Sequence, residues 1–564
     1  MMVIVRKMLP LWLVPISVLL LAACGGGGGG GNDNDSDQLA APKVTTKVPV
    51  APVTLTGRAT YTYYSVEPTI GIDYDRPVEL PVRGAVVELH SADGVVIDRA
   101  NTSNDGLYQF QVTGQSDVEV VVKAALGAPR NPDTKVVDNT SQQALYSLIM
   151  PVRVGEVDLR QDFNADSGWD GQSYSGTRAA APFAILDTIY KAQQLVRSAD
   201  SNVIFPDLLV NWSERNIPTK KNPTKNIPTS DLVSIGEIGI THFSSDNQIY
   251  ILGAAGIDTD EYDAHVIAHE WAHYLERVFS RSDSLGGHHQ LDDILDPSVA
   301  FSEGFGNAFS AMVLDDPIYV DAIGQHQAGL AITMDIEEDS TLDSETNDLN
   351  LIIDGFYSEA SVQEFLYDLY DRSEDESLQL GFTPIYEALA GRHKTTPAFT
   401  SMYSFLDALL AQDNIDGAAV SQLAADENIT RGDEYEAISH RIYTTLSTEG
   451  TILNQDVDGD PLRTWEDFGD IDKLGGNKLY NRMFFRYVAT TTGCFTIRVQ
   501  SAFNSDVLIY VPGRFNAISR RSGSEVYTGV NLGVNEAGSI AVGSKNNPIA
   551  FSIQMSLTPG ECNG

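Results

Sequence analysis

Basic residues are scarce in this chain of 564 residues. Its 37 lysines and arginines are outnumbered by 77 aspartates and glutamates, which leaves a net charge of −40 at pH 7. A surface with that excess repels phosphate backbones and anionic headgroups, so the composition argues against a nucleic-acid partner and against a basic membrane-surface protein. Hydrophobic residues are not scarce, and their share of 42% excludes a wholly disordered chain. The length suits about three or four domains.

Cysteine is scarcer still, with three in the chain, and the first ends an export signal. Arg6 and Lys7 precede an apolar run, Leu9 to Leu21, that is too short for a permanent membrane span of about 20 residues. The sequence LAAC that ends at Cys24 resembles the bacterial lipobox, which implies a signal peptide over residues 1–24 and lipid on Cys24. An ordinary secretory signal is the alternative. By resemblance to Gram-negative lipoproteins, Gly25 implies the outer membrane of the cell envelope.

The other two cysteines predict a disulfide. With Cys24 set aside for lipid, Cys494 and Cys562 remain, and an exported chain meets an oxidising compartment. No cysteine is then left for catalysis. Residues 25–52 open with a glycine run followed by polar residues, and they predict a flexible tether that holds the folded part off a membrane.

Residues 53–130 predict a small β-sandwich. Apolar and polar residues alternate in short runs, such as 85–89 and 108–112, and Asp-Gly turns separate the runs. The stretch PVRGAVVELHSADGVVIDRANTSNDGLYQF resembles the carboxypeptidase regulatory-like domain. That resemblance implies a transthyretin-like sandwich with an accessory function and no catalytic residue.

Residues 450–564 predict a second β-sandwich, because alternating runs return there. The runs are 484–488, 494–499, 507–511 and 551–555. Their order resembles the pre-peptidase C-terminal domain of secreted bacterial proteases. Asp456, Asp458 and Asp460 suggest a calcium loop, although Pro461 stands where an EF-hand requires glycine.

Residues 160–445, between the two sandwiches, predict a mainly α-helical domain with a small sheet. Apolar residues recur there with helical spacing in several segments. These segments are 178–196, 261–279, 298–314, 358–370 and 400–410. The predicted fold is therefore multidomain: a β-sandwich, a mainly helical core, and a C-terminal β-sandwich.

The run HEWAH at 269–273 is the strongest chemical signal in the chain. On a helix, positions i and i+4 lie on one face, so His269 and His273 can reach one zinc ion while Glu270 points beside it. Two satisfied core histidines are the alternative. His265 lies one turn earlier, and we expect it to be a packing residue.

A catalytic zinc ion needs a third protein ligand and an open position for water. Glu303, in FSEGFGNAF on the next predicted helix, is the candidate. With it the chain resembles the gluzincin metallopeptidases, the thermolysin-like and fungalysin-like group. The resemblance implies a zincin-like core in which His269, His273 and Glu303 hold zinc and Glu270 is the catalytic acid and base. Asn307 stands where the family often has an aspartate that orients a zinc histidine; a helix-surface amide is the alternative.

Other residues compete for the remaining roles. His288, His289 and Asp292 are rival third ligands, or else part of a cleft wall. In gluzincins a tyrosine or histidine on a later segment donates to the oxyanion, which makes Tyr357 the candidate here and His393 the alternative.

The sequence thus predicts an enzyme, a metallopeptidase with one catalytic zinc ion that hydrolyses a peptide or protein substrate. We expect it to be anchored by lipid to a bacterial membrane. The resemblance also implies that the strand predicted at 248–253 is an edge strand on which an extended substrate pairs, and an interior strand is the alternative. A surface adhesion or scaffold protein with a degenerate zincin core is the alternative function.

Overall fold

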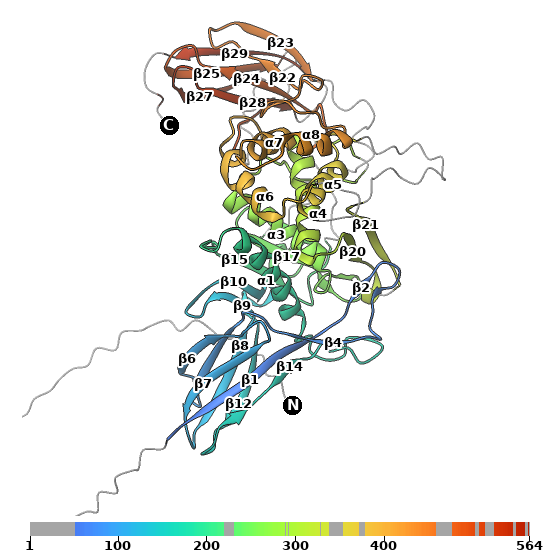
Figure 1. Ribbon diagram of the computed structural model, residues 1–564, viewed down its shortest axis with the longest axis vertical. Helices are drawn as coiled ribbons and strands as arrows, with labels where there is room; N and C mark the ends of the chain where they lie inside the picture. Colours follow the sequence, from blue (N-terminus) through green and yellow to red (C-terminus); the bar gives the residue numbers. More distant parts are fainter. Residues whose placement is uncertain are drawn as a thin grey trace, which may run out of the picture.

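The computed structural model describes residues 51–218, 230–287, 289–291, 293–327, 329–337, 354–371, 378–457, 477–501, 507–513, 524–544, 549–558 and 562. Bodies rich in β-strands lie at its two ends, and most of the helices lie between them (Figure 1). This confirms a multidomain chain in which β-sheets flank a helical region. Several predictions fall outside the described residues. They concern the signal peptide, the tether, Cys24, His288, Asp292, Asp458, Asp460 and Pro461.

The N-terminal body contains two sheets whose buried side chains share one core. One sheet is built around β1 and the other has the order β12-β8-β5-β6. The first contains β1 (Pro52–Tyr63), β4 (Val78–Pro81), β7 (Leu107–Thr113), β13 (Leu159–Arg160) and β14 (Phe163–Ala165). The second contains β5 (Val86–Ser91), β6 (Val96–Asn101), β8 (Asp117–Lys123) and β12 (Ser147–Arg153). Strand β7 shows why these sequences form strands, because Tyr108, Phe110 and Val112 are buried and the residues between them are exposed.

A third sheet connects the N-terminal body to the helices. Its order is β11-β10-β15-β17-β16, with β9 also paired to β10. Its strands are β9 (Ala125–Ala128), β10 (Asn131–Asp138), β11 (Ala144–Leu145), β15 (Leu208–Trp212), β16 (His242–Ser244) and β17 (Gln248–Ile251). The chain therefore enters this sheet at β9 and returns to the N-terminal body at β12, so the predicted boundaries at 130 and 160 do not separate two structural units. Strand β17 lies between β15 and β16, so it is interior, and β16 is the strand at the end of the sheet.

The helices of the middle region pack around α4 (Pro297–Leu314). Every residue of α4 from Pro297 to Met312 is buried, as expected for a helix that is apolar or small on all sides. Helix α3 (Ala264–Phe279) and helix α5 (Glu359–Tyr370) contact it. The other helices are α1 (Ala181–Ala199), α2 (Ser230–Ser234), α6 (Phe382–Ala388), α7 (Met402–Leu410) and α8 (Gly417–Asp426). A ribbon of two strands, β20 (Ile318–Ala322) and β21 (Ala331–Asp335), follows α4. None of the helices within the described residues is long and apolar enough to cross a bilayer.

The C-terminal body also consists of two sheets, and it has a core of its own. The first has the order β22-β24-β28-β26 and the second β23-β29-β25-β27. The strands are β22 (Tyr443–Thr445), β23 (Ile452–Val457), β24 (Arg482–Val488), β25 (Gly493–Ser501), β26 (Val507–Tyr510), β27 (Ser524–Leu532), β28 (Ala537–Ser544) and β29 (Ile549–Thr558). Asp456 of the predicted calcium loop lies in β23, where it pairs with Ala550.

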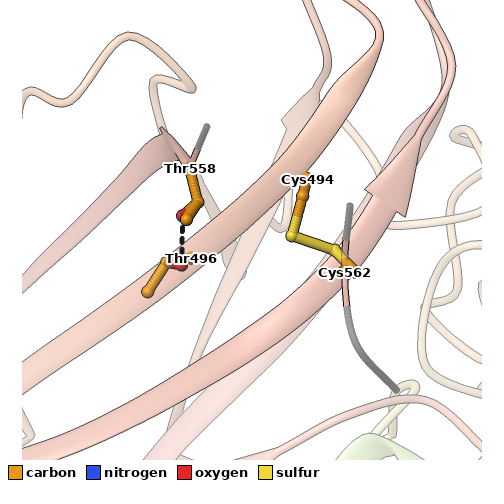
Figure 2. The surroundings of a disulfide bond; sticks show 4 residues. All are labelled: Cys494, Thr496, Thr558 and Cys562. Carbon is orange, nitrogen blue, oxygen red and sulfur yellow. Dashed lines mark hydrogen bonds between the residues drawn. A yellow bond between two sulfur atoms is a disulfide. The ribbon is translucent and has the colours of Figure 1, made fainter. Parts of the chain in front are cut away.

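Cys494 and Cys562 form a disulfide in the C-terminal body, as the sequence predicts (Figure 2). It closes a loop with a sequence separation of 68 residues. Nearby, the hydroxyl groups of Thr496 and Thr558 hydrogen-bond between neighbouring strands. The disulfide ties the end of the chain to β25.

Two buried ion pairs join the C-terminal body to the helical region. Arg482 of β24 binds Asp296 through two hydrogen bonds of 2.5 and 2.8 Å, and each of the two side chains is 1% exposed. Lys478 binds Asp293 at 2.6 Å. Asp296 is also the N-cap of α4, because its carboxylate accepts the N–H of Ser298. The start of α4 thus depends on a cation from the C-terminal body.

We predict that Arg482→Met destabilises the chain by about 3–5 kcal/mol, because the substitution leaves the buried carboxylate of Asp296 without its counterion. Arg392→Met is the control, since Arg392 is 63% exposed in its ion pair with Asp407 and should contribute less than about 1 kcal/mol. Urea unfolding of both variants measures the difference. An equal decrease in the free energy of unfolding in the two variants would contradict a special role for the buried ion pair.

Candidate metal centre

Helices α3 and α4 bring three predicted metal ligands together. The Nε2 atoms of His269 and His273 lie 3.1 Å apart, and Oε2 of Glu303 lies 3.3 and 3.4 Å from them. Three ligands of a tetrahedral zinc ion at 2.0–2.1 Å are separated by about 3.3 Å. The triangle therefore fits the first three positions of a zinc site. It is one of two groups of three metal-ligating side chains among the described residues.

Asn307 binds Nδ1 of His269, the ring nitrogen that faces away from the centre. Nδ1 of His269 donates to Oδ1 of Asn307 at 2.8 Å, and the amide nitrogen of Asn307 donates to Oε1 of Gln363 at 2.9 Å. Because Gln363 fixes the amide, its oxygen faces the histidine and Nε2 of His269 faces the centre. Asn307 thus occupies the orienting position that the sequence assigned to it.

Nδ1 of His273 lies close to two residues that the sequence analysis did not identify, Ser302 and Glu276. Nδ1 of His273 lies 3.2 Å from the hydroxyl of Ser302 and 3.5 Å from Oε2 of Glu276, and Ser302 donates to Glu276. Glu276 is buried. The available signal was its position three residues after His273, on the same face of the helix.

The side chains of the group shift one another's pKa values. Burial raises the pKa of Glu303, but the imidazoles of His289 and His273 outweigh burial and hold that pKa well below its usual range. Burial lowers the pKa of His273, yet the carboxylates of Glu303, Glu276 and Glu270 raise it well above its usual value. The buried carboxylate of Glu303 thus stays ionised and is stabilised by positive charge beside it.

Two glycines allow the three helices to approach this closely. A Cβ atom on Gly306 would lie 2.7 Å from the ring of His269. A Cβ atom on Gly304 would lie 2.6 Å from the carbonyl oxygen of Glu359 on α5. The GFG sequence of α4 therefore makes room for the ligand on one side and for α5 on the other.

Glu270 faces a cleft of about 800 Å³. Its Oε2 accepts the backbone N–H of Phe243 at 2.6 Å, so it lies beside the edge strand β16. The three candidate ligands line the same cleft, and Tyr319 of β20 and Met334 of β21 form part of its wall. The cleft thus combines a triangle of candidate metal ligands, a carboxylate next to it and an edge strand.

Of the rival ligands, His289 is described, and it lies at the cleft. Its Nε2 is 3.5 Å from Oε2 of Glu303 and 3.4 Å from Oε2 of Glu359. Burial lowers the pKa of His289, but these two carboxylates raise it above its usual value overall. The group of ligand atoms within 4.8 Å of one another contains His269, His273 and Glu303, and His289 is not part of it. The imidazole of His289 therefore lies at the side of the centre, between the carboxylates of Glu303 and Glu359.

The structure does not bring Tyr357 to the cleft, which corrects its predicted role as the oxyanion donor. Its hydroxyl donates to the carbonyl of Asp354 at 3.3 Å, its ring packs on Phe356, and it is absent from the residues that line the cleft. The alternative, His393, is fully buried against Phe301. His265 is a packing residue, as expected, and burial lowers its pKa to about 3.

Comparisons with known proteins add little. No family model matches the chain, and no curated protein matches it. Among solved structures, the chain is similar to PliG of Aeromonas hydrophila, a periplasmic lysozyme inhibitor of g-type lysozyme. The identity is 12%, the match covers 21% of this chain and 97% of PliG, and the TM-score is 0.13. A likeness this weak assigns neither a fold nor a function.

We predict that Gly306→Ala weakens zinc binding about 10- to 100-fold, because the added methyl group displaces the ring of His269. Gly155→Ala is the control, since a Cβ atom there meets nothing within 4 Å. Competition with a chromophoric chelator measures both dissociation constants. Unchanged zinc affinity in Gly306→Ala would show that His269 does not need this approach.

Proposed function

We propose that the chain is a zinc metallopeptidase of the gluzincin type, with a zincin-like core, that hydrolyses peptide bonds in a peptide or protein substrate. The observation that carries this proposal is the triangle of 3.1, 3.3 and 3.4 Å formed by His269, His273 and Glu303. Its sides suit zinc, and Glu270 stands next to it in an open cleft.

A zinc ion held by these three side chains supplies a Lewis acid that polarises a carbonyl group and lowers the pKa of water. Glu270 takes the proton of the attacking water and then delivers it to the nitrogen of the leaving amine. The hydrogen bond from Phe243 to Glu270 fixes the carboxylate in the cleft while it does so. Asn307 keeps His269 in the tautomer that presents Nε2 to the metal.

Substrate binding and charge stabilisation are assigned to two further elements. Strand β16 ends the sheet, and we assign peptide binding to its free edge; Glu270 already accepts the N–H of Phe243, so a substrate would pair with the remaining main-chain groups of that edge. We assign the role of oxyanion donor to His289 in place of Tyr357, because its ring lies at the cleft and its Nε2 is 3.4 Å from Oε2 of Glu359.

We also propose that the protein is a lipoprotein of the bacterial cell envelope, anchored through Cys24. The lipobox-like sequence supports this, although it lies outside the described residues. The disulfide between Cys494 and Cys562 is consistent with an oxidising compartment.

The test of the function is Glu270→Gln. The variant should retain zinc, because Glu270 is not part of the triangle, and should lose about 10²- to 10⁴-fold in kcat. Glu387→Gln is the control, because it makes the same change on the exposed side of α6 and should keep full activity. Hydrolysis of a fluorogenic peptide library by the zinc-loaded chain is the measurement. A wild-type chain that binds zinc and cleaves nothing would instead favour an adhesion or scaffold protein.

His289→Ala tests the assignment of the donor. We expect kcat to fall about 10²- to 10³-fold with zinc retained, because a transition-state hydrogen bond is lost. Tyr357→Phe should keep both activity and zinc, since its hydroxyl binds the carbonyl of Asp354. Zinc loss in His289→Ala would make His289 a ligand, and a lower kcat in Tyr357→Phe alone would restore the tyrosine to the site.

A further inference from the structure

A second group of carboxylates lies at one end of the cleft. Ligand oxygens of Asp260, Asp263 and Asp321 all lie within 4.8 Å of one another. Asp260 and Asp263 belong to the segment between β19 (Asp258–Thr259) and α3, and Asp321 belongs to β20. Asp260 is 4% exposed and Asp263 is fully buried. Three acids thus converge from two separate elements, two of them buried and Asp321 partly exposed at the cleft.

Two of the buried carboxylate oxygens lack a partner in the described part of the chain. One oxygen of Asp260 accepts the hydroxyl of Thr241, and one oxygen of Asp263 accepts the N–H of Ala322 at 3.0 Å. The other two, Oδ1 of Asp260 and Oδ2 of Asp263, have no hydrogen bond there. A buried charged oxygen without a partner is costly, and such groups in native proteins are usually paired or coordinate a metal ion.

The nearby arginine does not neutralise this group. Arg178 is buried and is already bound to Glu261 and to the carbonyl of Gly253. Burial, reinforced by the neighbouring carboxylates, raises the pKa of Asp260 and of Asp263 well above the usual range. Burial also raises the pKa of Asp321 to about 7. Without a cation beside them, the three carboxyl groups therefore resist ionisation.

We propose that Asp260, Asp263 and Asp321 bind one calcium ion. All three ligands are carboxylates, which hard cations prefer, whereas zinc prefers nitrogen and sulfur. Mg²⁺ usually binds through one or two carboxylates and keeps several waters, whereas Ca²⁺ takes six to eight oxygen ligands, so three converging carboxylates favour calcium. Asp258 also lines this end of the cleft and is a candidate for a further oxygen ligand.

The ion would connect two parts of the site. Asp263 directly precedes α3, which carries His269 and His273, and Asp321 lies on the β20–β21 ribbon that forms a wall of the cleft. One cation between them fixes the wall to the start of the metal-binding helix. A basic side chain of a substrate is the competing occupant, but the complete burial of Asp263 favours a bare ion.

The experiment measures calcium binding to the metal-stripped full-length chain by equilibrium dialysis with radioactive calcium, and the melting temperature with and without calcium. The wild-type chain should melt about 5 °C higher at a calcium concentration of about one hundred times Kd. Asp321→Asn and Asp263→Asn should each bind one calcium ion fewer and lose this rise. In calcium-free buffer at pH 8 both should melt no lower than wild type, because each substitution removes a carboxylate whose ionisation is opposed by its acidic neighbours.

Asp316→Asn is the matched control. It makes the same charge change next to the same ribbon, where Asp316 is exposed and accepts the N–H of Ile318. It should keep the full calcium response. No calcium bound by the wild-type chain, or an equal loss in Asp316→Asn, would overturn the proposal. A third result would also overturn it: the wild-type chain binds no calcium, and Asp321→Asn changes the cleavage of peptides that contain lysine or arginine. That result would show that the group binds a basic side chain of the substrate. The dialysis requires neither zinc nor hydrolysis, so its failure leaves the proposed peptidase function untouched.

Discussion

The contact between α3 and α4 is the constraint on which the rest of the centre depends. The triangle closes because the ring of His269 reaches the backbone of α4 at Gly306, where a Cβ atom would lie 2.7 Å from it. The same contact places Asn307 and Ser302 behind the two histidines. Ligand geometry, imidazole orientation and the burial of Glu303 thus follow from one helix packing against another. A small shift of α4 would disturb all three together.

Several carboxylates lie in this centre, and each has different neighbours. Glu276 lies behind His273, Glu303 faces the triangle and Glu359 holds His289. Burial raises the pKa of Glu359, whereas the histidines keep Glu303 ionised. The net charge of the chain alone said nothing of this arrangement, because it does not reveal which acids are buried beside a histidine and which are in water.

The sequence predicted the parts of the structure that local spacing controls. The five predicted helices are present, and their ends differ from the prediction by three residues at most. The two histidines and Glu303 followed from the zinc-binding spacing on α3 and from the resemblance of the next helix. What failed depends on pairing between distant segments. Strand β10 pairs with β15, about 70 residues later, so one sheet contains segments from both sides of the boundary predicted at residue 160. Tyr357 was placed by analogy, and its hydroxyl turned out to bind Asp354.

The ion pair between Asp296 and Arg482 also bears on the order in which the molecule matures. The two residues are 186 positions apart, so the N-cap of α4 acquires its counterion only after residue 482 has been synthesised. Domains usually fold from the N-terminus as they emerge. Until residue 482 has been made, the carboxylate that caps the helix of Glu303 lacks its Arg482 counterion. We therefore expect a chain that stops before β24 to seat α4, and with it Glu303, less firmly beside the two histidines, so that the centre forms only after β24 has been made.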